Sequence, residues 1–471
     1  MQSSYGFKKI YIENNQYIFV LKGDKMDKNL KMKIVSDLKK SEKDIGNLLS
    51  QLIKFKTENP PVDNNEIQRF IKERLEEYGA QAQIHHLNHK AVPLTSSLGK
   101  MDNNNFILYG HADVVPAGDL RKWKYDPFSG KIIGNRIYGR GAVDMKGGLA
   151  AAIAAFGLLT HYDAESQLAM GVSFVSVLDE ENWFPTDKGY GTSKWLLETG
   201  KLKGNACIMG EPTALYKIII GERGDYWIKL TCISKPRHGS FPVFEKNPNI
   251  VISNVLNEIY SNVKEIKVTL PSEIKDILLN SYDYMGRDLA KIEAKELRED
   301  LKIDELKKML YTPSMNVGTL NGGTMINIVP DRSESMVAFT VPIGMKRNEL
   351  HNLISGIVAK YKERGVSVEP TDNDETDPTF TLPTSNLVTA AQKAVKSVLH
   401  NESFLVIFPG TSDGNVFRSH GIDTCFAGPG NSFLAHTYNE CVSIKDIVRA
   451  AEIYVNSVFG YNTFFTKEGK Q

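Results

Sequence analysis

Apolar positions in the first half of the chain follow two different periods. The segments "SEKDIGNLLSQLIKF" and "NEIQRFIKERLEEYG" have helical spacing, and Gly79 ends the second of them. Three short apolar runs follow, "NFILYG", "MGVSFVSVL" and "NACIMG", and they are separated by the helical stretches "GGLAAAIAAFGLL" and "GTSKWLLETG". Strands that alternate with helices predict an α/β domain with a mostly parallel sheet flanked by helices.

The pattern changes after residue 221. The segments "GDYWIKLTCIS", "NPNIVISNVLNEIYSNV" and "INIVPDRSESMVAFTVPIG" predict a strand, a helix and further strands, which together form a smaller α+β sandwich. Helices and strands of the first kind return after Met345. We therefore predict an N-terminal extension at 1–39, with a hairpin about "ENNQ", a main domain at 40–220 and 342–465, and an inserted domain at 221–341. A charged helical segment near 272–311 is expected to be a solvated insertion.

Composition and charge exclude several kinds of partner. The 471 residues carry 57 basic and 56 acidic side chains, and this net charge of +1 provides no field for nucleic acid or an acidic membrane. No apolar run approaches the roughly 20 residues that span a bilayer. Four scattered cysteines favour free thiols in a reducing compartment. We expect a cytoplasmic protein with no nucleic-acid or membrane partner.

Acidic and histidine side chains follow the predicted strands. In an open α/β sheet, ligands bind beyond the carboxyl ends of the strands, where side chains from several strands meet. The candidates at these ends are His111, Asp113, Glu180, Glu181, Glu211 and His436, and the glycine-rich turn "GRGAVDMKGG" adds Asp144. Because carboxylates gathered at one edge repel each other, a cation is needed to neutralise them.

The mixture of imidazoles and carboxylates is typical of zinc and similar ions. His111 and Asp113 are two residues apart, so Asp113 can hold the ring N–H of a metal-bound His111. Glu180 and Glu181 point to different sides, which leaves one of them free as a base. A single ion needs only three or four protein ligands. The larger set of candidates, His111, Asp144, Glu181, Glu211 and His436, indicates two ions that share a carboxylate.

Two other functions have sequence features of their own. The segment "GTSDG" fits the nucleophile elbow of serine hydrolases, and Asp423 and His436 follow Ser412 in the required order. Pro409 beside the turn and the absence of an HGGG segment weigh against this hypothesis. A noncatalytic binding protein with the same fold would be expected to lack a ligand or the base, and none is missing.

Eight fragments occur in the order found in one enzyme family: "GHADVVP", "GRGAVDMKGG", "DEEN", "GEPT", "RHGSFP", "NVGTLNGGTMINIVPD", "GTSDG" and "GPGNSFLAHTYNE". The chain resembles, from about residue 40 to 459, the dinuclear zinc amidohydrolases that include acetylornithine deacetylase, succinyl-diaminopimelate desuccinylase, aminoacylase and glutamate carboxypeptidase. The resemblance implies a zinc-peptidase-like catalytic domain, an inserted lid and dimerisation domain, and a homodimer.

The resemblance also assigns roles to residues. It implies that Asp144 bridges two divalent ions, with His111 and Glu211 at one and Glu181 and His436 at the other. It makes Glu180 the general base, with Asp113 behind His111. The lid residue His238 would stabilise the oxyanion in a neighbouring subunit. The remaining predicted residues bind substrate, and they are Asn327, Gly410, Thr411 and Ser412.

The resemblance implies hydrolysis of the amide bond of an N-acyl amino acid, with metallocarboxypeptidase or dipeptidase activity as the alternative. Zinc is the expected metal, with cobalt or manganese as alternatives. The acyl group and the amine stay open, because pocket residues choose the substrate. Many relatives carry an arginine where this chain has Thr340, and the insertion near 272–311 is a second departure.

Overall fold

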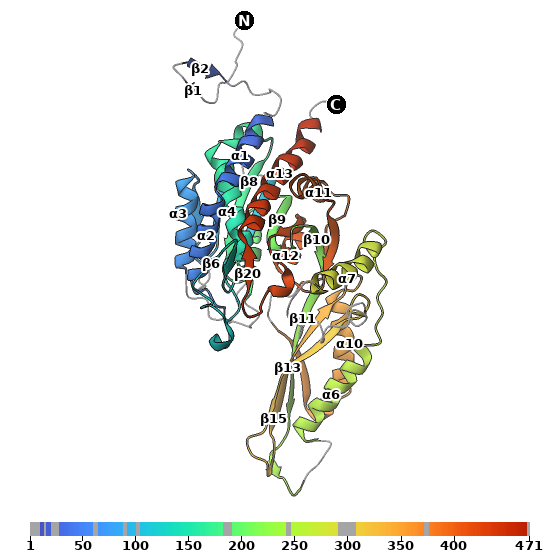
Figure 1. The fold of residues 1–471 in the computed structure, drawn as a ribbon. Helices are drawn as coiled ribbons and strands as arrows, with labels where there is room; N and C mark the ends of the chain where they lie inside the picture. Colours follow the sequence, from blue (N-terminus) through green and yellow to red (C-terminus); the bar gives the residue numbers. More distant parts are fainter. Residues whose placement is uncertain are drawn as a thin grey trace.

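The computed structural model describes residues 10–13, 16–19, 28–59, 65–87, 92–99, 104–181, 191–241, 246–290, 308–371 and 376–468. Figure 1 shows a larger unit, in which α1 (Lys28–Lys40) and α13 (Ile444–Glu468) lie side by side, and a narrower unit that extends from it. A short hairpin, β1 (Ile10–Glu13) with β2 (Gln16–Phe19), precedes the larger unit, as the pattern predicted.

The larger unit is built on a nine-stranded mixed sheet in the order β17-β10-β19-β9-β5-β8-β4-β3, with β18 paired to β10. Its four central strands, β19, β9, β5 and β8, run parallel to one another. Their carboxyl ends therefore meet at one edge of the sheet. The strands are β3 (Ala82–Ile84), β4 (Leu94–Leu98), β5 (Asn105–His111), β8 (Gly171–Val177), β9 (Ala206–Pro212), β10 (Lys217–Glu222), β17 (Thr379–Phe380), β18 (Phe404–Phe408) and β19 (Asp423–Gly428).

Helices cover both faces of this sheet because successive side chains of a strand point to opposite sides. Phe106 and Leu108 of β5 pack in the core that contains the longer helices. Ile107 and Tyr109 pack on the other side with the two short helices α5 and α12. The longer helices are α1 (Lys28–Lys40), α2 (Glu42–Lys54), α3 (Glu66–Glu77), α4 (Lys146–His161), α11 (Asn386–Leu399) and α13 (Ile444–Glu468), and the short ones are α5 (Thr192–Glu198) and α12 (Asp413–Ser419). The predicted α/β architecture is confirmed.

Helix α4 lies unusually close to the sheet. It is buried along almost its whole length, which explains its alanine-rich sequence. A Cβ atom at Gly148 would lie 1.9 Å from the carbonyl oxygen of Gly210 in β9, so only glycine permits this approach. The contact brings the amino end of α4, and the loop before it, to the carboxyl edge of the central strands.

The narrower unit has a sheet of its own, in the order β13-β15-β11-β16. Alternate residues of its strands, such as Ile228 and Phe339, pack under two helices, which confirms the predicted α+β sandwich. Its elements are β11 (Gly224–Ile233), α6 (Pro248–Val263), β13 (Ser314–Gly322), β15 (Arg332–Val341), α10 (Arg347–Ala359) and β16 (Val366–Pro370). The domain limits at 221 and 341 stay a prediction. Two elements of the narrower unit, α10 and β16, lie beyond residue 341.

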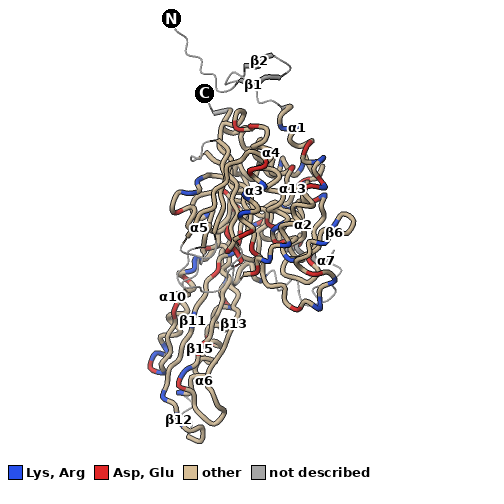
Figure 2. The backbone as a smooth tube through the Cα atoms, turned by 90° about the vertical axis from the view of Figure 1, so that its left-hand side faces the viewer, with Lys and Arg blue, Asp and Glu red and all other residues tan. Residues whose placement is uncertain are grey.

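Two small sheets accompany the larger ones. The strands β12 (Arg237–His238) and β14 (Ile328–Val329) pair with each other, and Figure 2 places β12 at the far end of the narrower unit. A second small sheet contains β6 (Lys131–Ile133), β7 (Arg136–Tyr138) and β20 (Cys441–Ser443). None of the helices in the described ranges is both long enough and apolar enough to cross a membrane.

The described part of the charged segment near 272–311 is only partly solvated. It forms a helix, α7 (Lys275–Ala290), as predicted, but one side of this helix packs against β18. Leu278 and Ser281 are buried, and the Ser281 hydroxyl accepts a hydrogen bond from the backbone N–H of Ile407. Residues 291–307 of the segment lie outside the described residues.

Candidate metal centre

The carboxyl edge of the central strands brings the predicted ligands together. His111 is the last residue of β5, Glu211 lies near the end of β9, and Asp144 lies in the loop before α4. Nε2 of the buried His111 is 3.1 Å from Oδ1 of Asp144 and 3.5 Å from Oε1 of Glu211. Glu180, which follows β8, places its Oε2 at 3.9 Å from the same nitrogen. One imidazole thus faces three carboxylates.

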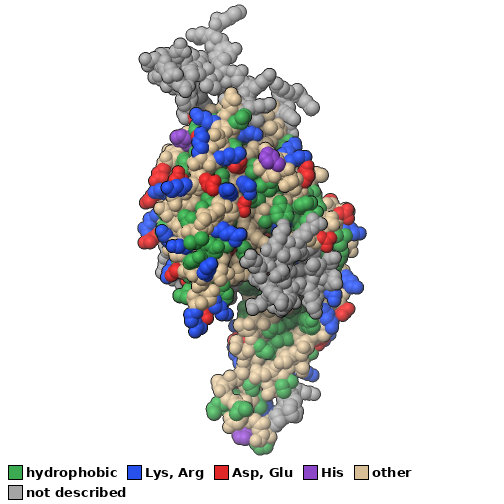
Figure 3. Space-filling view, in the orientation of Figure 1, with side chains coloured by type: hydrophobic (Ala, Val, Ile, Leu, Met, Phe, Trp, Pro, Cys, Tyr) green, Lys and Arg blue, Asp and Glu red, His purple; other side chains and the backbone are tan. Residues whose placement is uncertain are grey.

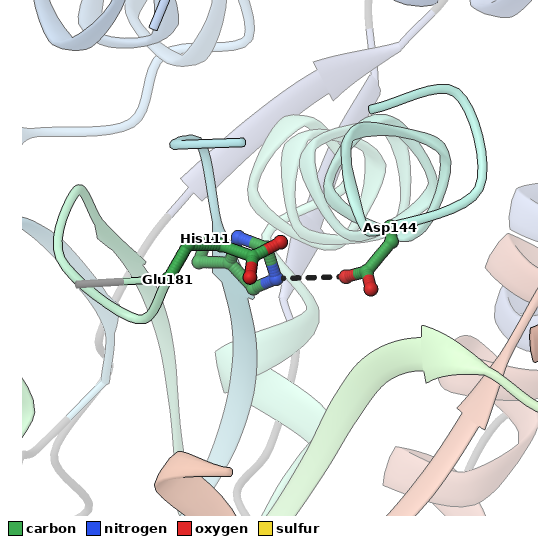
Figure 4. A group of neighbouring side chains, drawn as sticks. All are labelled: His111, Asp144 and Glu181. Atoms are coloured by element: carbon green, nitrogen blue, oxygen red, sulfur yellow. Dashed lines mark hydrogen bonds and ion pairs between the residues drawn. The ribbon is translucent and has the colours of Figure 1, made fainter. Parts of the chain in front are cut away.

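A second imidazole approaches the same group from the loop after β19. Nε2 of His436 is 3.3 Å from Oδ2 of Asp144 and 3.1 Å from Oε1 of Glu181. Each oxygen of Asp144 therefore faces a different histidine. Ligand atoms of His111, Asp144 and Glu181 all lie within 4.8 Å of one another, and Figure 4 shows these three side chains converging from separate elements.

Asp113 lies directly behind His111, as the spacing predicted. Nδ1 of His111 is 3.0 Å from the backbone oxygen of Asp113 and 3.4 Å from its Oδ1. The other oxygen, Oδ2, accepts hydrogen bonds from Nδ2 of Asn59 and from the backbone N–H of Glu181, both at 2.9 Å. Sequence reasoning missed Asn59 because the segment "TENPP" indicated only the end of a helix. Its contact with Asp113 joins residues 54 positions apart.

Burial and mutual repulsion control the charges at this edge. Burial raises the pKa values of Glu180 and Glu211 well above their usual range, and neighbouring carboxylates raise them further while His111 opposes the shift. Burial opposes protonation of His436, but its hydrogen bonds with Asp144 and Glu181 raise its pKa to about 10. Burial and repulsion prevent these carboxylates from all being charged together. With the two imidazoles, they form a set of ligand atoms that fits bound divalent cations.

Asp179, the residue before Glu180, has a structural role. Its buried carboxylate accepts hydrogen bonds from the backbone N–H and the hydroxyl of Thr192, the first residue of α5. Burial, with the charge of Asp413, raises its pKa to about 8. Asp413 in turn accepts hydrogen bonds from the hydroxyls of Tyr109 and Ser193. The contacts of Asp179 hold the segment that carries Glu180 and Glu181 against α5, and those of Asp413 join the start of α12 to β5 and α5.

A cavity of about 550 Å³ opens beside the cluster. The predicted substrate-binding residues Gly410, Thr411 and Ser412 line it, together with Glu180 and His436. Another part of the wall comes from the base of the second sheet. Of its residues only Thr340 was singled out from the sequence, because the pairing of strands distant in sequence places the others there. Its residues include Asp225 and Trp227 of β11, Asn316 of β13, and Ala338 and Thr340 of β15.

Two predicted residues lie away from this cavity. His238 in β12 and Asn327 beside β14 are exposed and adjacent, since the backbone N–H of Gly239 donates to the carbonyl oxygen of Asn327 at 2.7 Å. They stand at the far end of the narrower unit (Figure 2). The structure of one chain therefore does not bring either residue to its own metal centre.

The three residues of the serine-hydrolase hypothesis do not assemble. Asp423 begins β19, whereas His436 follows the opposite end of that strand, so the length of the strand separates them. His436 faces Asp144 and Glu181 instead. Ser412 is the N-cap of α12, and its hydroxyl also hydrogen bonds with Glu222. These contacts favour the metal hypothesis.

Solved structures with the same fold come from several organisms. A metallo-carboxypeptidase of the M20 family from Sulfolobus solfataricus superposes with a TM-score of 0.73 at 22% identity, over 88% of this chain and 98% of that one. A di-peptidase from Saccharomyces cerevisiae gives 0.69 at 17% identity, over 92% and 98%. A dinuclear metal binding M20 peptidase from Bacillus subtilis gives 0.57 at 14%, over 92% and 98%.

Sequence comparisons give curated relatives of matching length. A succinyl-diaminopimelate desuccinylase of Ehrlichia canis is 28% identical over 426 residues, which cover 86% of this chain and 95% of the relative. A probable succinyl-diaminopimelate desuccinylase of Staphylococcus aureus is 24% identical, over 89% and 98%. The model of peptidase family M20/M25/M40 matches residues 107–459, which include every side chain of the cluster. The chain is thus an enzyme that belongs to peptidase family M20/M25/M40.

Proposed function

We propose that this enzyme hydrolyses the amide bond of N-acyl amino acids, in the manner of acetylornithine deacetylases and succinyl-diaminopimelate desuccinylases, with two divalent metal ions. The observation that carries the proposal is the Asp144 carboxylate between two imidazoles, His111 and His436, with the Glu180 carboxylate 3.9 Å from Nε2 of His111. The desuccinylases among its relatives, which match it over nearly their whole length, support the acyl amino acid as substrate.

The side chains fall into two ligand groups that share one member. Asp144 would hold both ions, with His111 and Glu211 completing one site and Glu181 and His436 the other. Zinc suits this set of nitrogen and oxygen donors best, and cobalt is a close substitute. Two bound cations would lower the pKa of a water molecule and polarise the amide carbonyl.

The remaining chemistry belongs to Glu180. It lies beside the ligands without being needed as one, and its buried carboxylate has a high affinity for a proton. We assign it as the general base that accepts the proton of the attacking water and then donates it to the leaving amine nitrogen. Asp113, fixed by Asn59 and the N–H of Glu181, keeps the His111 ring in one orientation.

The substrate preference is tested by comparing amides. With zinc or cobalt added, N-succinyl and N-acetyl amino acids are expected to be cleaved with a kcat/KM at least about tenfold above that of dipeptides, a difference that pocket contacts worth about 1–3 kcal/mol supply. Steady-state assays over both substrate sets provide the measurement. Faster cleavage of dipeptides, or of C-terminal residues from peptides, would instead establish the alternative peptidase activity. The carboxypeptidase and the di-peptidase described above share the fold of this chain.

We further propose a homodimer formed through the narrower unit. Figure 3 shows hydrophobic side chains at its surface, and the exposed ones include Phe241, Val317, Leu320, Met325 and Ile326. Isolated exposed apolar side chains are ordinary, but a group of them on one unit indicates a contact surface. Because His238 lies far from its own centre, a second subunit is the place where it would act.

Mixed dimers test this arrangement. His238→Ala and Glu180→Gln subunits are each expected to be inactive alone and to regain part of the activity when mixed and allowed to exchange, because one site in a hybrid then has both residues. Hydrolysis is followed after mixing, with sedimentation to measure the mass. A monomeric protein, or mixtures no more active than their components, would show that His238 does not act across subunits.

We place the enzyme in the cytoplasm, in amino-acid biosynthesis. All four cysteines are free in the structure, although Cys207 and Cys425 are buried on adjacent strands. Free thiols are expected in a reducing compartment. The biosynthetic role rests on the desuccinylases to which the chain is similar.

A further inference from the structure

Glu440 lies four residues after His436 and is completely buried. Its carboxylate accepts four hydrogen bonds. Oε1 accepts from the backbone N–H groups of Val143 at 2.6 Å and Asp144 at 3.1 Å. Oε2 accepts from the backbone N–H of Gly141 at 3.1 Å and from Nη1 of Arg140 at 2.8 Å. One side chain therefore binds the backbone of the loop that presents Asp144.

Arg140 extends these contacts to two further loops. Its buried guanidinium donates to the backbone oxygens of Thr437, at 3.2 Å, and Pro116, at 3.4 Å. It also lies over the ring of Trp123, with 5.2 Å between the guanidinium carbon and the ring centroid. The Glu440–Arg140 pair thus joins the loop after Asp113, the loop of Asp144 and the loop of His436.

These loops need such a constraint. Residues 139–145 form no regular secondary structure before α4, and backbone contacts within a helix or sheet therefore do not fix Asp144. His436 and Asn439 have φ angles of 61° and 60°, in the left-handed region that residues with a Cβ rarely adopt. Two groups anchor the end of this segment: the Asn439 side chain, which hydrogen bonds with the backbones of Lys122 and Lys124, and the buried Glu440.

We infer that Glu440 is a positioning residue for the metal centre: it fixes the backbone of Asp144 and, through the adjoining turn, His436, so that ligands from two distant segments meet in one geometry. This inference rests on the proposed function, since it takes Asp144 and His436 as ligands. Glu440 contacts neither imidazole of the cluster in the contacts described, and it acts through backbone N–H groups and Arg140.

The test is metal binding by a Glu440→Gln variant. All four partners of Glu440 donate hydrogen bonds to it. Glutamine replaces one accepting oxygen with an NH₂ group, which is itself a donor and cannot accept from them. We expect the Kd for Co²⁺ to rise by about 10- to 100-fold, the usual cost of losing a residue that supports metal ligands. Isothermal titration calorimetry measures the Kd, and the visible absorption of Co²⁺ reports the geometry of its ligands.

Glu452→Gln is the matched control. Glu452 is also a largely buried glutamate with a basic partner, Lys39 at 3.4 Å, but it lies in α13 on the side of α1. This variant is expected to bind Co²⁺ as the parent does. The unfolding midpoint of each metal-free protein shows how much stability each substitution removes. A weakened Co²⁺ affinity in Glu440→Gln alone supports positioning.

If Glu440→Gln does not fold, Arg140→Lys tests the same pair, since lysine keeps the charge but loses the paired contacts to Thr437 and Pro116. It is expected to weaken Co²⁺ binding and alter the Co²⁺ spectrum. Unchanged affinity in a folded Glu440 or Arg140 variant overturns the inference and leaves the proposed function intact. An equal loss in Glu452→Gln also overturns it. A parent protein that binds no Co²⁺ overturns the proposed function itself.

Discussion

Replacing Glu180 by glutamine is expected to lower kcat by about 100- to 10,000-fold, the usual contribution of a general base. Glutamine keeps the shape of the side chain but cannot accept the proton of the attacking water. The variant should still bind two metal ions per chain, because the proposed ligand groups are complete without Glu180. Steady-state kinetics on an N-acyl amino acid and elemental analysis of the same sample provide the two measurements.

The neighbouring residue supplies the matched control. Glu181 is the next residue after Glu180, and its Oε1 lies 3.1 Å from Nε2 of His436. Glu181→Gln is expected to lose activity together with metal from the site that it shares with His436. If Glu180→Gln kept half of the parent activity, or lost metal as Glu181→Gln does, the assignment of base and ligand to these two residues would be wrong.

Removal of metal should abolish hydrolysis, and this is the second large effect. The buried Glu180, Glu211 and Glu181 have raised pKa values, because burial and neighbouring carboxylates disfavour their charged forms. Cations at this edge would reverse that preference and are therefore needed for an ionised base. Dialysis against a chelator, followed by assay, is the measurement. Zn²⁺ or Co²⁺ should restore activity, whereas Mg²⁺, which prefers oxygen ligands, should not.

A serine-directed reagent serves as the control for metal removal. Because Ser412 is an N-cap and is not assembled with Asp423 and His436, the reagent should leave hydrolysis unchanged. Inactivation by that reagent together with full activity in chelator would revive the nucleophile-elbow hypothesis and contradict the metal account.

The residues of the cluster were predictable because of where they stand in the sequence. His111, Glu180, Glu181 and Glu211 each lie at or directly after the end of a recognisable apolar run, and the parallel arrangement of central strands makes these ends meet. The spacing of Asp113 from His111 likewise sufficed to place it behind the ring.

Other features depend on contacts that no local pattern contains. Asp225 and Trp227 line the cavity only because β11 pairs with β15 and the second sheet stands over the first. Glu440 is the last residue of the fragment "GPGNSFLAHTYNE", but its hydrogen-bond partners lie about 300 positions earlier in the chain. The packing of α7 on β18 was missed for a similar reason, since its charged composition conceals one buried side.

The most direct test of the account is the number of metal ions that one chain binds and needs. Metal-free protein is titrated with Zn²⁺ or Co²⁺ while bound metal and hydrolysis of an N-acyl amino acid are measured on the same samples. The account predicts binding of two ions per chain, with full activity at two equivalents and loss of bound metal when Asp144 is replaced by asparagine. A fully active protein that contains no tightly bound metal would contradict it.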